Sequence, residues 1–156
     1  MKVGEKEREM NRTGPPEEPA YLLVYGTLLQ TIDHPYARLL RQQSTFRGRG
    51  SFPGRLYDLG PYPGAVYAAG AATRVHGDIL SLRHPEQVLS VLDAYEGYDP
   101  RSRQSSLYRR EVVEVRSGEE QVWCWVYLYN QSTAGFLHIR SGDYGKYRRQ
   151  KQAKTR

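Results

Sequence analysis

The chain has 156 residues, 38% of them hydrophobic, which is enough for one domain with a single core. No stretch approaches the roughly 18 apolar residues of a membrane-spanning helix, and the first ten residues lack the apolar core of a secretory signal, so we expect a cytoplasmic protein. The net charge of +6 is concentrated in residues 144–156, which hold six Lys/Arg and no Asp/Glu. Because the rest of the chain is nearly neutral, we do not expect it to bind nucleic acid except through this basic end.

Metal and disulfide chemistry are not expected. Cys124 is the only cysteine, so no internal disulfide can form, and we expect a buried, unreactive thiol. The four histidines do not show the spacing of metal ligands. The sequence therefore predicts no metal and no cofactor.

The composition divides the chain into three parts. Residues 1–19 are charged and end in GPPEEP, a composition that does not pack, so we expect them to be disordered. Residues 20–145 are expected to form one domain. Residues 146–156 are expected to be a basic, flexible tail.

The first half of the domain is predicted to consist mainly of strands. Tyr21–Tyr25 is a short aromatic and β-branched run, typical of a buried strand. His34–Gln42 has its apolar residues on one face of a predicted helix. Phe46–Leu59 is expected to be a bent strand with a bulge, because glycine and proline interrupt it. Gly60–Ala68 leads from a loop into a strand, and Arg74–Leu82 alternates as a strand does.

The hydrophobic period changes in the second half. Pro85–Gly97 begins with proline and glutamate and stops at glycine, as helices do. Its apolar stripe consists of Val88, Leu89, Leu92 and Tyr95. Two strands, Leu107–Val115 and Gln121–Tyr129, follow and are joined by a hairpin loop. The predicted fold is α+β: a compact mixed sheet curled into a small barrel, with two main helices.

The first candidate site follows the first strand, in YLLVYGTLL. Beyond the strand, the sheet no longer uses the amides of Tyr25, Gly26, Thr27 and Leu28. Gly26 also lets the backbone curve with no side chain in the way. Such amides can bind a carboxylate or an oxyanion. An ordinary turn is the commoner use of such a tetrapeptide, and the motif alone does not decide between the two.

The second candidate is Glu96, in LDAYEGYD at the end of the predicted helix. The apolar neighbours Leu92 and Tyr95 could desolvate it, and the helix C-terminus is the negative end of the helix dipole. Both effects raise the pKa of a carboxyl group toward neutrality, where a general base works best. A surface glutamate beside a C-cap glycine is the commoner alternative.

Two tyrosines could line a pocket. Tyr108, in LYRREVVEV, lies on a predicted strand, where its hydroxyl could fix a polar substrate. Tyr62 lies between two prolines in GPYPGAV, a stiff loop that suits a pocket wall. A place in the core or in a turn explains each of them as well.

Together, the order and spacing of these motifs resemble the gamma-glutamylcyclotransferase-like family, which includes the gamma-glutamylamine cyclotransferases and AIG2-like proteins. YGTL looks like the family's substrate loop, and LDAYEGYD looks like the segment with its acid/base glutamate. LYRREVVEV and VWCWVYLYN are similar to the two strands that follow. The resemblance covers roughly residues 20–145 and implies a barrel-like α+β fold with a pocket at one end.

The resemblance also implies a reaction, a cyclisation of transferase or lyase type. The α-amine of a gamma-glutamyl group attacks the gamma-carbonyl of the same group, which expels an amine or amino acid and closes 5-oxoproline. Glu96 would be the general acid/base, and the amides of residues 25–28 would bind the oxyanion. By the same resemblance, Tyr108 would orient the substrate and Tyr62 would belong to a pocket loop. The expected partner is a small gamma-glutamyl compound, with no cofactor.

The segment after the tetrapeptide departs from the family. Members often carry a basic, glycine-containing stretch where this chain has LQTID, residues 29–33. The resemblance therefore leaves the leaving amine open. The alternative is a non-catalytic member of the same fold that binds a small metabolite.

Overall fold

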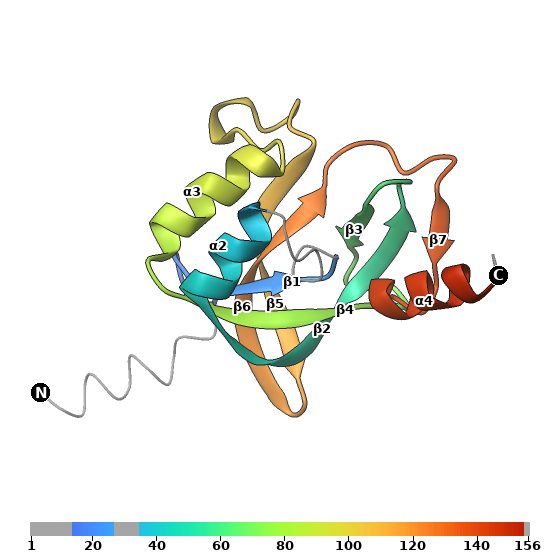
Figure 1. The fold of residues 1–156 in the computed structure, drawn as a ribbon, viewed down its shortest axis with the longest axis horizontal. Helices are drawn as coiled ribbons and strands as arrows, with labels where there is room; N and C mark the ends of the chain where they lie inside the picture. The colour runs from blue at the N-terminus through green and yellow to red at the C-terminus, as the bar shows by residue number, and fades with distance from the viewer. Residues whose placement is uncertain (1–13, 27–34, 155–156) are drawn as a thin grey trace, which may run out of the picture.

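A computed structural model describes residues 14–26 and 35–154 of the chain (Figure 1). In these residues the strands are β1 (Tyr21–Val24), β2 (Ser44–Asp58), β3 (Pro63–Tyr67), β4 (Arg74–Leu82), β5 (Tyr108–Ser117), β6 (Glu120–Tyr129) and β7 (Leu137–Ile139). The helices are α2 (Pro35–Gln43), α3 (Pro85–Tyr95), α4 (Tyr144–Lys154) and a short 3₁₀ helix at Pro100–Ser102. The predicted α+β class is confirmed.

Five strands close into a barrel in the order β2-β4-β1-β6-β5, and β5 returns to β2 through the pair Ser51 and Arg116. Neighbouring strands are antiparallel, except that β1 and β6 run parallel. β3 and β7 pair with the second half of β2, beyond the barrel. The register of β2 shifts between Phe46 and Gly48, at the predicted bulge. The curled barrel expected from the sequence is therefore confirmed.

The apolar run in β1 is explained by burial on both of its faces. Successive residues of a strand face opposite sides, and Leu22 and Leu23 are each only 1% exposed. Leu23 packs inside the barrel with Phe52, whereas Leu22 packs with Leu92 in a second cluster that includes residues of α2 and α3. Full burial of one leucine stabilises a fold by about 1.5–3 kcal/mol. These two contacts hold the end of β1 between the barrel interior and the helices.

Helix α3 begins and ends close to the predicted residues. Pro85 opens it, and Gly97 follows its end with a φ of +66°, a left-handed conformation that favours glycine. Most of the predicted stripe is buried, namely Val88, Leu89 and Leu92. Tyr95 differs, because it is 41% exposed and its ring lies 4.2 Å from that of Tyr36 on α2. Tyr95 therefore connects the two helices at the surface instead of filling the core.

The expectation of a flexible tail over residues 146–156 is wrong for most of that segment, because α4 occupies Tyr144–Lys154. Tyr144 is only 5% exposed and belongs to the core cluster inside the barrel. The Tyr147 hydroxyl donates a hydrogen bond to Asp58 on β2, which also pairs with Lys151 at 3.3 Å. Two tyrosines one turn apart thus attach an otherwise charged helix to the barrel. Residues 155–156 lie outside the described part of the chain.

The expected disordered segment, residues 1–19, falls mostly outside the described residues. Residues 14–18 are described; they are exposed and lie in neither a helix nor a strand. In the described part of the chain, no helix has both the length and the apolar character needed to cross a membrane.

Candidate active site

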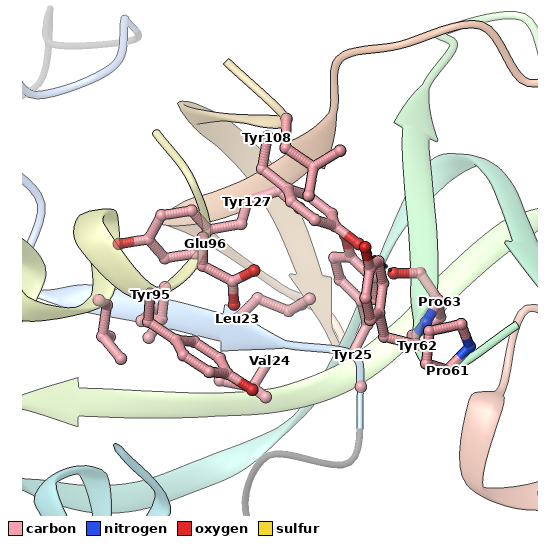
Figure 2. A pocket seen from close by; sticks show the side chains of 14 residues that line it. Leu23, Val24, Tyr25, Pro61, Tyr62, Pro63, Tyr95, Glu96, Tyr108 and Tyr127 are labelled. Atoms are coloured by element: carbon pink, nitrogen blue, oxygen red, sulfur yellow. Dashed lines mark hydrogen bonds between the residues drawn. The ribbon is translucent and has the colours of Figure 1, made fainter. Parts of the chain in front are cut away.

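A pocket of about 400 Å³ lies where the end of β1, the segment before β3 and the C-terminal turn of α3 meet (Figure 2). Its wall contains five of the seven residues expected to form a site: Tyr25, Gly26, Tyr62, Glu96 and Tyr108. The other two, Thr27 and Leu28, lie outside the described residues. The rest of the wall consists of Leu22, Leu23, Val24, Pro61, Pro63, Leu92, Tyr95, Leu107 and Tyr127.

Glu96 reaches the pocket because α3 ends one residue before it. The Glu96 amide donates a hydrogen bond to the Leu92 carbonyl at 2.8 Å, which continues the last helical turn. Gly97 then reverses the chain, and the Tyr98 amide donates to the Asp93 carbonyl at 2.9 Å. Figure 2 shows the Glu96 carboxylate pointing into the space between the tyrosine rings of the pocket.

Burial raises the pKa of Glu96 to about 7 from its ordinary value of 4.5. No described residue donates a hydrogen bond to this carboxylate that would offset the loss of water. The desolvation expected from the apolar neighbours of Glu96 is therefore present. A carboxyl group that titrates near neutral pH can accept a proton and return it, as a general acid/base must.

The hydroxyls of Tyr25 and Tyr108 are engaged within the protein. The Tyr25 hydroxyl donates to the Tyr127 carbonyl and accepts from the Ala65 amide at 3.2 Å. The Tyr108 hydroxyl donates to the Pro63 carbonyl at 2.7 Å. Burial, and next the charges of nearby groups, raise the pKa of both phenols. Both side chains therefore stay neutral and tie β1 and β5 to the start of β3; Tyr108 can still meet a ligand with its ring or as an acceptor.

Gly26 is not required by the packing of the described residues. A Cβ at this position would lie 3.4 Å from Pro63 Cγ, an ordinary contact, and its φ is outside the left-handed range. Neither a clash nor backbone strain explains the glycine. The backbone at this position is therefore not covered by a side chain of its own.

The mouth of the pocket is aromatic. Tyr62 is 42% exposed between Pro61 and Pro63, and its ring centroid lies 6.2 Å from that of Tyr108. Tyr95 forms another exposed part of the wall. The stiff loop predicted around Tyr62 therefore does line the pocket.

The described part of the pocket wall carries little charge. Among the described lining residues, Glu96 is the only charged side chain. Residues 27–34, which continue from Gly26, contain no Lys or Arg. Across the described residues, no group of three or more His, Cys, Asp or Glu could hold a metal ion. The site thus presents one desolvated carboxylate, several neutral phenols and the main chain at the end of a strand.

Sequence reasoning missed three polar residues in or next to the pocket wall, namely Asp93, Arg110 and Tyr127. Asp93 is only 8% exposed. It forms a bidentate ion pair with Arg110 on β5, at 2.7 and 3.0 Å, and accepts a hydrogen bond from the Tyr127 hydroxyl at 2.7 Å. The available signal was the position of Asp93, one turn before Glu96 and on the same helix.

Tyr25→Phe tests how β1 is held at the pocket. We expect the variant to lose about 1–3 kcal/mol of unfolding free energy, because the Tyr127 carbonyl and the Ala65 amide both lose a buried partner. Urea denaturation measures the loss. Tyr57→Phe is the control, because no described residue hydrogen-bonds the Tyr57 hydroxyl. Equal losses in the two variants would contradict a special role for the Tyr25 hydroxyl.

The sequence has relatives of known family. A family model described as gamma-glutamyl cyclotransferase, AIG2-like, matches residues 22–146. A protein of Vibrio cholerae serotype O1, named as a candidate gamma-glutamylcyclotransferase, is 30% identical over 124 residues, which is 79% of this chain and 93% of its own. The gamma-glutamylcyclotransferase family protein YtfP of Escherichia coli K12 is 34% identical over 90 residues, or 58% of this chain and 66% of its own.

Solved structures share the fold. An AIG2-like protein from Mus musculus superposes with a TM-score of 0.61 at 24% identity, over 82% of this chain and 89% of that one. The solution structure of YtfP from Escherichia coli gives a TM-score of 0.57 at 26% identity, over 80% of this chain and 95% of that one. These likenesses and the family model agree with the resemblance of the motifs. The chain therefore belongs to the gamma-glutamyl cyclotransferase, AIG2-like family.

Proposed function

We propose that this chain is a cyclotransferase that releases 5-oxoproline and a free amine or amino acid from a gamma-glutamyl compound. One observation carries the proposal: the desolvated carboxylate of Glu96 lies in the same pocket as Tyr25 and Gly26, at the end of β1. The pocket volume of about 400 Å³ is within the usual range for small-molecule sites, roughly 300–1,000 Å³.

Glu96 is assigned the proton transfers. The substrate's α-amine is protonated at neutral pH and cannot attack in that form. The ionised Glu96 accepts its proton, the amine nitrogen bonds to the gamma-carbonyl carbon, and the bond from that carbon to the leaving nitrogen then breaks. Glu96 returns this proton to the leaving nitrogen, and the ring nitrogen then passes its second proton through Glu96 to the released amine, which departs as an ammonium ion. Both protons are thus transferred to the leaving amine, no water is consumed and the carboxylate is regenerated.

The main chain at the end of β1 is assigned the stabilisation of the oxyanion. When the amine attacks, negative charge moves to the gamma-carbonyl oxygen, and preorganised amides stabilise such charge. The proposal places this oxygen at the main chain of Tyr25 and Gly26. Thr27 and Leu28, whose amides are also proposed, follow outside the described residues. Because nucleophile and carbonyl belong to one molecule, holding the substrate in a folded conformation supplies much of the rate.

Direct detection of product tests the proposal. Purified protein is incubated with a panel of gamma-glutamyl compounds whose leaving amines are apolar, cationic or carboxylate-bearing, and 5-oxoproline is measured by mass spectrometry. We expect release from at least one class. No release from any compound, together with saturable binding of 5-oxoproline, would instead support the non-catalytic alternative.

The pH dependence of the reaction follows from the state of Glu96. Only the ionised carboxylate accepts a proton, and burial raises its pKa to about 7. We therefore expect kcat to fall about tenfold per pH unit below pH 7 and to level off above it. Initial rates between pH 5 and 9 at saturating substrate measure this limb. A limb centred near pH 4.5 would mean that an ordinary, solvated carboxyl group controls the rate.

A further inference from the structure

We propose that Asp93, held by Arg110 and Tyr127, is a positioning residue that keeps Glu96 in the wall of the pocket. The inference rests on the proposed role of Glu96 and adds three residues that the family resemblance did not supply. It concerns how the C-terminal turn of α3 is attached to the barrel.

The Asp93 carboxylate is fixed at both oxygens. Its Oδ1 accepts from Arg110 Nε and from the Tyr127 hydroxyl, each at 2.7 Å, and its Oδ2 accepts from Arg110 Nη2 at 3.0 Å. The two charged side chains are only 12% and 17% exposed. The Arg110 guanidinium also lies 4.2 Å from the ring centroid of Trp125, so it has little freedom to turn. A bidentate pair of this kind sets orientation as well as distance.

The main chain transmits this attachment to Glu96. Asp93 and Glu96 are three residues apart, on neighbouring positions of the same helical turn. The Asp93 carbonyl accepts from the Tyr98 amide, so Asp93 also closes the turn that contains Glu96. Displacing Asp93 from Arg110 would release both its side chain and this turn from β5 and β6.

Tyr127 connects the two halves of the site. Its hydroxyl donates a hydrogen bond to Asp93, which lies on α3 three residues before Glu96. Its main-chain carbonyl accepts a hydrogen bond from the hydroxyl of Tyr25, at the end of β1. One residue of β6 therefore holds the proposed base and the proposed oxyanion site at a fixed separation. Catalytic groups need such a separation held within a fraction of an ångström.

The pKa of Glu96 depends on its position, because the groups around it exclude water and carry no charge that would offset this. The titratable groups that line the pocket with it are the phenols of Tyr25, Tyr62, Tyr95, Tyr108 and Tyr127. Burial raises the pKa of Tyr25, Tyr95, Tyr108 and Tyr127, so these four stay uncharged at neutral pH. On its own helix the nearest charge is Asp93, which is neutralised by Arg110. Loosening of the turn would admit water to Glu96, and its pKa would fall.

The test separates positioning from stability. In the double variant Asp93→Leu/Arg110→Met both charges are removed, so no charge is left unpaired in the interior, and such replacements often keep a fold stable. The Tyr127 hydroxyl still has an acceptor in the Leu89 carbonyl, at 3.4 Å. Urea denaturation gives the stability, carbon-13 NMR gives the Glu96 pKa, and initial rates of 5-oxoproline release give kcat and KM.

We expect a folded double variant in which the Glu96 pKa falls from about 7 toward 4.5. We also expect kcat to fall about 10- to 100-fold with little change in KM, because the substrate still binds but the base is displaced. The control is Arg47→Gln/Glu120→Gln, which removes an exposed ion pair of 2.9 Å and should change neither value. A folded double variant with the wild-type Glu96 pKa and kcat would overturn the proposal.

Two further measurements cover the cases in which the double variant does not fold or the wild type is inactive. If the double variant does not fold, Tyr127→Phe removes one bond to Asp93 and leaves the ion pair; it should shift the Glu96 pKa in the same direction, and an unchanged value would overturn the proposal. If the wild type releases no 5-oxoproline, the proposed function fails, whereas the NMR comparison of Glu96 still decides the positioning.

Discussion

Glu96→Gln is expected to lower kcat for release of 5-oxoproline by about 10²–10⁴-fold, the usual contribution of a positioned general acid/base. Glutamine has nearly the same shape as glutamate, so the pocket wall formed with Leu92 and Tyr95 stays in place. Its amide cannot accept the proton of the attacking amine. Because substrate binding does not depend on this proton transfer, KM should change much less than kcat.

The matched control for this prediction is Glu86→Gln. It makes the same chemical change on the same helix, but Glu86 is exposed in the first turn of α3 and does not line the pocket. Initial rates should show the roughly 10²–10⁴-fold loss in Glu96→Gln and a wild-type kcat in Glu86→Gln. Turnover retained in Glu96→Gln would reject Glu96 as the base, even if the wild type makes 5-oxoproline.

The parts of the fold that were predictable are those with strong local signals. Leu22 and Leu23 lie in a run that is apolar on both faces, as a strand buried on both sides requires. Pro85 and Gly97 mark the two ends of α3 because their backbone preferences suit those positions. Helix α4 was missed because Tyr144 and Tyr147 are two anchors in a segment whose charge dominates its composition.

The candidate site was predictable only as separate pieces. Glu96 and Gly26 each carried a local reason for their chemistry, but about seventy residues separate them. Their meeting in one pocket depends on how β1 and α3 pack on the barrel. The contacts of Asp93 are harder still, since Arg110 lies 17 positions away and Tyr127 lies 34 away. Such pairs follow from strand register, which no local pattern in this chain specifies.

The same Glu96→Gln variant is expected to be more stable than the wild type above pH 7. Burial raises the pKa of Glu96 in the folded protein to about 7, against 4.5 for an ordinary glutamate. Well below pH 4.5 the group is protonated in both the folded and the unfolded chain, so the ionisation of Glu96 contributes nothing to the free energy of unfolding. As pH rises from 4.5 to 7, Glu96 ionises in the unfolded chain before it ionises in the folded one, so the free energy of unfolding of the wild type falls. The total loss is about 3 kcal/mol and is complete above pH 7.

Urea denaturation of both proteins at pH 4, 5.5, 7 and 8 measures this difference. Glutamine does not titrate, so the advantage of Glu96→Gln should be greatest at pH 8 and vanish near pH 4. Glu86→Gln should instead be slightly less stable than the wild type at pH 8, because a carboxylate in the first turn of a helix is stabilising. Equal stability of wild type and Glu96→Gln at pH 8 would mean that Glu96 is solvated and poorly suited to act as a base. A variant that gains stability while it loses turnover cannot owe that loss to unfolding, so the two measurements together assign the lost activity to the carboxylate itself.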